Sequence, residues 1–69
     1  MSIEVWVWHF REEGDGRWDW GAEAERRKPE PRLELFVRGR ATTEREALAA
    51  QAAAKATVEQ MVQLFEEGG

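Results

Sequence analysis

Residues 3–10, Ile-Glu-Val-Trp-Val-Trp-His-Phe, are rich in the β-branched and aromatic side chains that favour a strand. Side chains alternate between the two faces of a strand. One face of this segment carries Trp6, Trp8 and Phe10, and the other carries Ile3, Val5 and Val7. Both faces are therefore apolar. The segment predicts the first strand of a sheet, and the packing of the chain depends on which of its faces is covered.

Residues 18–25 alternate in the same way, with Trp or Ala at even positions and Asp, Gly or Glu at odd positions. The intervening residues 11–17 contain two Gly and several charges, which is typical of a surface turn. An antiparallel register with Phe10 opposite Trp18 predicts that every large aromatic side chain of this hairpin lies on one side. The same register places His9 opposite Asp19 on the other side.

The second half of the chain predicts a third strand and a helix. Residues 26–31 include two Pro, which cannot continue a ladder, and residues 32–38 then alternate as a strand. Thr43 and Glu46 have the spacing of a capping box, and residues 44–67 are rich in helix-forming types. The apolar stripe of this helix has small side chains first and bulky ones last: Ala47, Ala50, Ala54, Val58, Met61, Val62 and Phe65.

These elements predict an α+β fold, a three-stranded antiparallel β-meander with one C-terminal α-helix packed across one face (β-β-β-α). The whole chain, residues 1–69, forms a single domain. Large Trp side chains pack well against the small Ala side chains of the helix. The helix is therefore expected to cover the Trp side of the hairpin, with Leu33, Leu35 and Val37 joining that side.

The side chains present favour a protein that is not an enzyme. His9 is the one histidine, and neither Cys nor Tyr occurs in the sequence. No activated nucleophile accompanies His9, because Thr43 is committed to the helix cap. The acidic turn lacks the spacing of a calcium loop. The sequence therefore predicts no catalytic, cofactor-binding or metal-binding residues, and no cofactor.

The composition of the chain limits the kinds of partner that it is expected to bind. The net charge of −4 disfavours sequence-independent binding of nucleic acid, and no apolar run is long enough to span a membrane. The absence of Cys fits a reducing compartment, so a cytoplasmic location is expected. Four Trp in 69 residues keep one alternative open, a single-stranded nucleic-acid binder that stacks bases on a Trp/Arg sheet surface.

The apolar side chains left uncovered predict a protein-protein interaction module. If the Trp side is buried, the apolar side chains on the opposite face of the sheet form an exposed patch as large as a typical interaction site. The predicted helix is longer than the strands, so its apolar end should overhang. The expected partner is a second copy, a host protein or both. In size, acidity and lack of catalytic side chains the chain is similar to the small inhibitor proteins that phages and mobile elements encode. The predicted partner-binding residues are Ile3, Val5, Val7, Phe36, Met61, Leu64 and Phe65.

Overall fold

The computed structural model describes residues 3–68 and contains three strands followed by one helix. Strand β1 spans Val5–Arg11, β2 spans Trp18–Arg26, β3 spans Leu33–Ala41, and helix α1 spans Glu44–Gly68. The strands form one antiparallel sheet in the order β1-β2-β3. The predicted β-β-β-α fold is confirmed, and the strands and helix begin and end within three residues of the expected positions.

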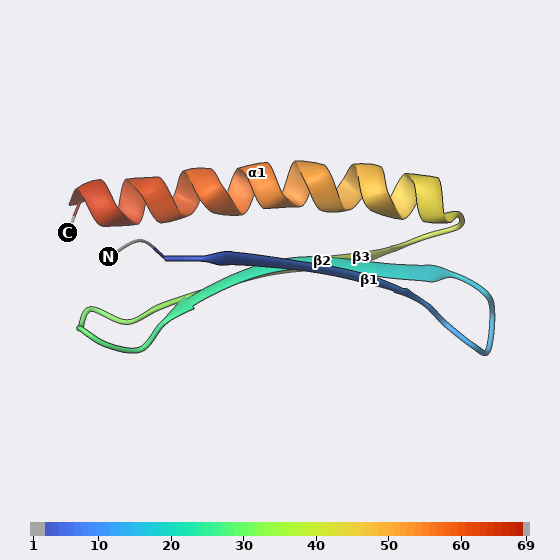
Figure 1. Ribbon diagram of the computed structural model, residues 1–69, viewed down its shortest axis with the longest axis horizontal. Helices are drawn as coiled ribbons and strands as arrows, with labels where there is room; N and C mark the ends of the chain where they lie inside the picture. The colour runs from blue at the N-terminus through green and yellow to red at the C-terminus, as the bar shows by residue number, and fades with distance from the viewer. Residues whose placement is uncertain (1–2, 69) are drawn as a thin grey trace.

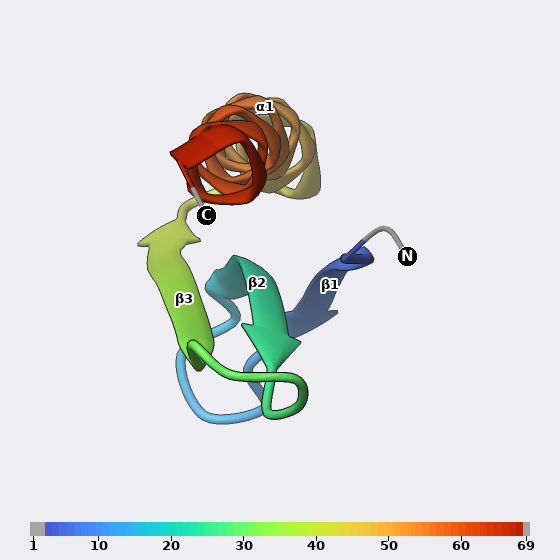
Figure 2. The same ribbon diagram turned by 90° about the vertical axis from the view of Figure 1, so that its left-hand side faces the viewer.

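Helix α1 lies along the long axis of the molecule, whose extents are 42 × 18 × 14 Å, and covers one face of the sheet (Figure 1). Seen along the helix, α1 is on one side of the three strands, and no element formed by residues 3–68 covers the opposite side (Figure 2). The fold is thus two layers with one uncovered sheet face. Any function that needs an extended surface has this face available.

The helix begins at the predicted capping box. The Glu46 amide donates to Thr43 Oγ1 at 3.2 Å, and Thr43 Oγ1 donates to Glu46 Oε1 at 2.9 Å. The cap supplies a partner for one of the amides that the first helical turn leaves unpaired. It fixes the direction in which α1 leaves β3 and crosses the sheet.

The hairpin register differs by one residue from the predicted one. Arg11, not Phe10, lies opposite Trp18, and His9 lies opposite Trp20 rather than Asp19. The turn closes with the Glu12 amide donating to Arg17 O at 2.7 Å, and Gly16 supplies a left-handed residue with φ 72°. A shift of one residue exchanges the faces of a strand. The aromatic side chains of β1 and β2 therefore lie on opposite sides of the sheet.

The face assignment predicted from residues 3–10 is wrong as a consequence. The buried core consists of small side chains, in which Ala22 and Ala24 of β2 meet Ala54, Val58 and Val62 of α1. Because β2 presents only methyl groups at its centre, the helix backbone approaches the sheet closely, and the larger side chains fill the flanks. The half-buried residues packed against this core are Ile3, Val5, Trp20, Leu33, Leu35 and Val37.

Candidate interaction surface

We call the uncovered side of the sheet the open face. Its side chains come from alternate positions of the three strands and stand in rows that the register sets. Strand β1 contributes aromatic side chains, the central strand β2 contributes carboxylates around Gly21, and β3 contributes a mixture. The rows, from one end of the face to the other, are Glu25 and Glu34; Trp6, Glu23 and Phe36; Trp8, Gly21 and Arg38; Phe10, Asp19 and Arg40.

Aromatic side chains dominate the exposed area of the open face. Trp6 is 61% exposed, Phe36 54% and Phe10 50%. Trp8 is half-buried, stacks on Phe10 with ring centroids 5.8 Å apart, and lies over the backbone of Gly21. Four aromatic rings on one uncovered sheet face are a large apolar surface for a domain of this size.

One row of the open face places Glu23 between two aromatic side chains. Trp6 is the cross-strand neighbour of Glu23 on β1, and Phe36 is its neighbour on β3. These side chains line a groove of about 260 Å³, to which Glu25 and Glu34 also contribute. The groove therefore combines apolar walls with a carboxylate floor.

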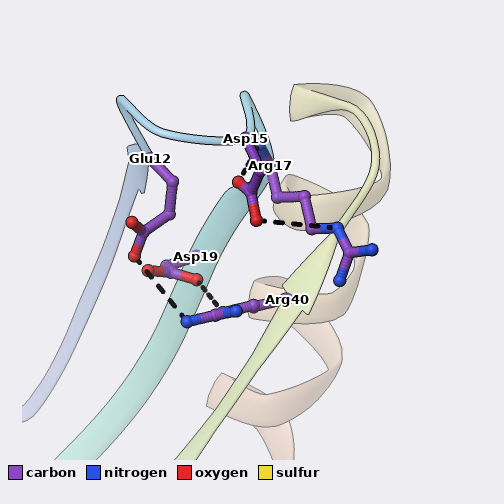
Figure 3. A network of polar contacts seen from close by, with 5 residues as sticks. All are labelled: Glu12, Asp15, Arg17, Asp19 and Arg40. Carbon is purple, nitrogen blue, oxygen red and sulfur yellow. Dashed lines mark hydrogen bonds and ion pairs between the residues drawn. The ribbon is translucent and has the colours of Figure 1, made fainter.

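The other end of the open face carries a compact polar network (Figure 3). Arg40 Nε lies 3.1 Å from Asp19 Oδ1, and an Arg40 terminal nitrogen lies 3.9 Å from Glu12 Oε1. A hydrogen bond to Asp19, with the charge of that carboxylate, raises the pKa of Glu12 above its ordinary value of 4.5, and Arg40 opposes this rise. Arg17 pairs separately with Asp15 in the turn. Arg40 is thus already engaged by two carboxylates of its own chain.

The open face has more acidic than basic groups. Within the three strands its acids are Asp19, Glu23, Glu25 and Glu34, and its bases are Arg38 and Arg40. Just outside the strands, Arg27 and Arg32 pair with Glu25 and Glu34, and Glu12 contacts Arg40. The Arg38 guanidinium carbon lies 5.4 Å from the centroid of the Phe36 ring. Within the strands, the face is therefore aromatic on β1, acidic along β2, and basic on the half of β3 that carries Arg38 and Arg40.

The seven predicted partner-binding residues do not form one surface. Ile3 and Val5 pack against the buried core on the helix side of the sheet, and Val7, 36% exposed, lies on that same side. Their predicted position on an uncovered face is wrong, because the helix covers that face. Of the four predicted partner-binding residues outside the helix, Phe36 is the one that lies on the open face.

The helix residues of that prediction are also divided. Met61 and Leu64 are 45% and 61% exposed, whereas Phe65 is half-buried with the Arg26 guanidinium carbon 4.7 Å from its ring centroid. The expected free apolar end of the helix is therefore reduced by Arg26 of β2, which covers Phe65. A role for these residues in partner binding stays a prediction.

His9 lies on the helix side of β1 and does not pair with Asp19 as predicted. Its Nε2 is 3.6 Å from Glu44 Oε2 at the start of α1, and its ring centroid is 5.9 Å from that of Trp18. Asp19 instead pairs with Arg40 across the open face. The contacts of His9 link the first strand to the first turn of the helix.

The main prediction placed the aromatic side chains of β1 in the core, and only the alternative of a nucleic-acid binder with a Trp/Arg sheet surface left Trp side chains exposed. The register assigns Trp6, Trp8 and Phe10 to the open face. Gly21 is the sequence feature that could have predicted this placement. A glycine opposite Trp8 leaves room for the indole to lie across the central strand. That pairing requires the aromatic face of β1 to join the polar face of β2.

Comparison of the chain with protein-family models, with curated proteins and with solved structures finds no match. Among residues 3–68, no three His, Cys, Asp or Glu side chains are grouped so that they could hold a metal ion. Over the same residues, no helix has both the length and the apolar character needed to cross a membrane. The arguments for function therefore rest on the open face.

Proposed function

We propose that the protein is a non-enzymatic protein-protein interaction module that binds its partner through the open face of the sheet. The observation that carries the proposal is the exposure of Trp6, Phe10 and Phe36 on a single face that no other element of the described residues covers. Aromatic side chains are enriched at the centres of protein interfaces, where their burial contributes most of the binding energy.

The distribution of apolar side chains supports this assignment over a purely structural role. The buried core is built from Ala and Val, and the largest fully buried side chain is Val58. A chain selected only for stability gains from burying its largest apolar side chains. Here Trp6 and Phe36 remain largely in solvent, which is the arrangement expected when their burial is reserved for a partner.

The proposal includes no chemistry at His9. Its polar neighbour is Glu44 and its ring neighbour is Trp18, and neither is a hydroxyl or thiol that an imidazole base could activate. The lack of Cys supports a cytoplasmic location as part of the proposal. An inhibitor that binds a host protein, of the kind that phages and mobile elements encode, is the form of this function that the size and acidity of the chain favour.

Affinity capture with matched variants tests the assignment of the surface. Trp6→Ser and Phe36→Ser, made together, remove two exposed rings of the open face, whereas Leu48→Ser removes an exposed apolar side chain of the helix that is not among the predicted partner-binding residues. We expect the open-face pair to abolish capture of the partner that the wild type retains, and the helix variant to preserve it. Capture that survives the open-face pair in a folded protein would contradict the proposal.

A second candidate function is single-stranded nucleic-acid binding, which the same face favours through one observation. Arg38 and Arg40 stand on β3 across the sheet from Trp8 and Phe10, an arrangement in which bases stack on the rings while the guanidinium groups contact phosphates. Carboxylates along β2 oppose the approach of phosphates. Quenching of Trp fluorescence by a poly-dT oligonucleotide, relieved by salt, would favour this candidate over the protein partner.

A further inference from the structure

Glu23 differs from the neighbouring carboxylates of the open face in having no cationic partner. Glu25 pairs with Arg27, Glu34 pairs with Arg32 at 3.0 Å, and Asp19 pairs with Arg40. Among the residues described, 3–68, no Lys or Arg nitrogen lies within 4.0 Å of a Glu23 carboxylate oxygen. Glu23 is nevertheless half-buried between Trp6 and Phe36. A carboxylate in that environment gains from a cation.

Resting on the proposed function, we propose that the groove between Trp6 and Phe36 binds a Lys or Arg side chain of the partner protein. The faces of aromatic rings attract cations, and Glu23 supplies the opposite charge at the floor of the groove. Strands β1 and β3 are two strand spacings apart, about 10 Å. A long basic side chain that enters the groove can therefore reach both rings with its aliphatic stem and charged head.

The charges around the groove support a basic occupant. Glu25 and Glu34 form the next row and line the groove, but they are paired with Arg27 and Arg32. At the opposite end of the open face, Arg40 pairs with Asp19 and contacts Glu12. The negative charge that is free to attract a cation is therefore that of Glu23, in the groove itself.

A second copy of the chain is a poorer occupant of this face. Two copies packed face to face around a two-fold axis have that axis in the plane between the sheets. With that axis along the strands and through the centre of the face, β2 lies over β2 of the other copy. Glu23 and Glu25 then face the same two carboxylates of that copy, which disfavours this packing.

Titration with a basic peptide tests the inference. The probe is acetyl-Gly-Arg-Gly-Arg-Gly-amide, with the same peptide carrying Gln in place of both Arg as its control. We expect the Arg peptide to shift the Trp6 indole N–H resonance of the 15N-labelled protein, and the Gln peptide to leave it unchanged. Binding should weaken as salt is raised, because the groove residues are exposed to solvent. Absence of a shift with the Arg peptide would overturn the inference.

Two variants that change the net charge equally test whether the peptide binds in the groove. Glu23→Gln removes the carboxylate of the groove, and Glu66→Gln removes an exposed carboxylate of the helix. Loss of one cation–carboxylate or cation–π contact is expected to weaken binding about fivefold for Glu23→Gln and for Trp6→Leu. Glu66→Gln should bind as the wild type does. Equal affinities of Glu23→Gln and Glu66→Gln would overturn the inference.

The partner itself separates this inference from the proposed function. If Trp6→Ser with Phe36→Ser abolishes capture while Glu23→Gln does not alter it, the open face binds a partner without a basic side chain in the groove, and only the inference fails. If neither change alters capture by the folded protein, the proposed function fails as well.

Discussion

The indole of Trp8 lies directly over Gly21, its cross-strand neighbour on β2, so closely that a Cβ on Gly21 would overlap the ring at Cζ2. The same relationship occurs on the helix side of the sheet. Trp20 covers Gly39, its neighbour on β3, and a Cβ built there would lie 2.5 Å from Trp20 Cζ2. Each face of the sheet thus has one indole seated on a glycine of the next strand, and the ring compensates for the side chain that glycine lacks.

Gly21→Ala is expected to destabilise the fold by about 1–3 kcal/mol, the usual cost of forcing extra atoms into a filled position. The new methyl group must displace the Trp8 ring, which would also lose its stacking on Phe10. Gly14→Ala is the matched control, because no atom of another part of the chain lies within 4 Å of a Cβ at that position. Urea denaturation measures the difference. Equal midpoints for the two variants would show that Trp8 moves aside without cost.

The elements of the fold could be predicted from the sequence because each depends on a local signal. Alternation of apolar residues indicates the strands, two Pro interrupt the chain before β3, and the Thr43–Glu46 capping box starts the helix at the expected residue. Each of these signals acts within a few residues, so none of them depends on which face of the sheet is covered.

The register of the hairpin could not be derived in the same way, because β1 is apolar on both faces. Either register buries apolar side chains, and the choice depends on two contacts between strands. One is the closure of the turn between Glu12 and Arg17, and the other is the fit of Trp8 on Gly21. The candidate site was missed for that reason, since moving one residue along β2 transfers Trp6, Trp8 and Phe10 from the core to the open face.

The two Trp residues on opposite faces are expected to respond differently to truncation. Trp20 packs against the core under the helix, so Trp20→Ala should lower the free energy of unfolding by about 3 kcal/mol. Trp6 is 61% exposed, so Trp6→Ala should change it by about 0.5 kcal/mol or less. Thermal and urea denaturation compare the two variants. A larger loss for Trp6→Ala would mean that the open face is covered within the folded chain.

Glu12 is expected to make stability depend on pH just above 4.5. The raised pKa means that folded Glu12 keeps its proton at pH values where the unfolded chain has lost it. The folded state then binds more protons, and the free energy of unfolding falls as pH rises through the window from 4.5 to the raised value. Above that window the charged pair with Asp19 is a constant unfavourable contribution; below it the contribution is absent.

Glu12→Gln should therefore gain in melting temperature relative to the wild type when pH is raised from 4 to 7. Removal of the carboxylate ends the repulsion by Asp19 and leaves Asp19 paired with Arg40. Glu13→Gln, a neighbouring change with the same effect on net charge, controls for the overall charge of the protein. A gain of equal size in both variants would attribute the effect to net charge rather than to the Glu12–Asp19 contact.

Introduction of a charge into each face of the sheet tests the assignment of the faces most directly. Val5 packs against the buried core beneath α1, so Val5→Lys must either bury an ammonium group or separate the helix from β1, at a cost of about 2 kcal/mol or more. Phe36 is 54% exposed on the open face, so Phe36→Lys should leave the unfolding midpoint almost unchanged, helped by the nearby carboxylates of Glu23 and Glu34. Circular dichroism and urea denaturation of the two variants measure the contrast. If Phe36→Lys unfolded the protein while Val5→Lys did not, the helix would have to lie on the opposite side of the sheet, and the open face would lose its role as the binding surface.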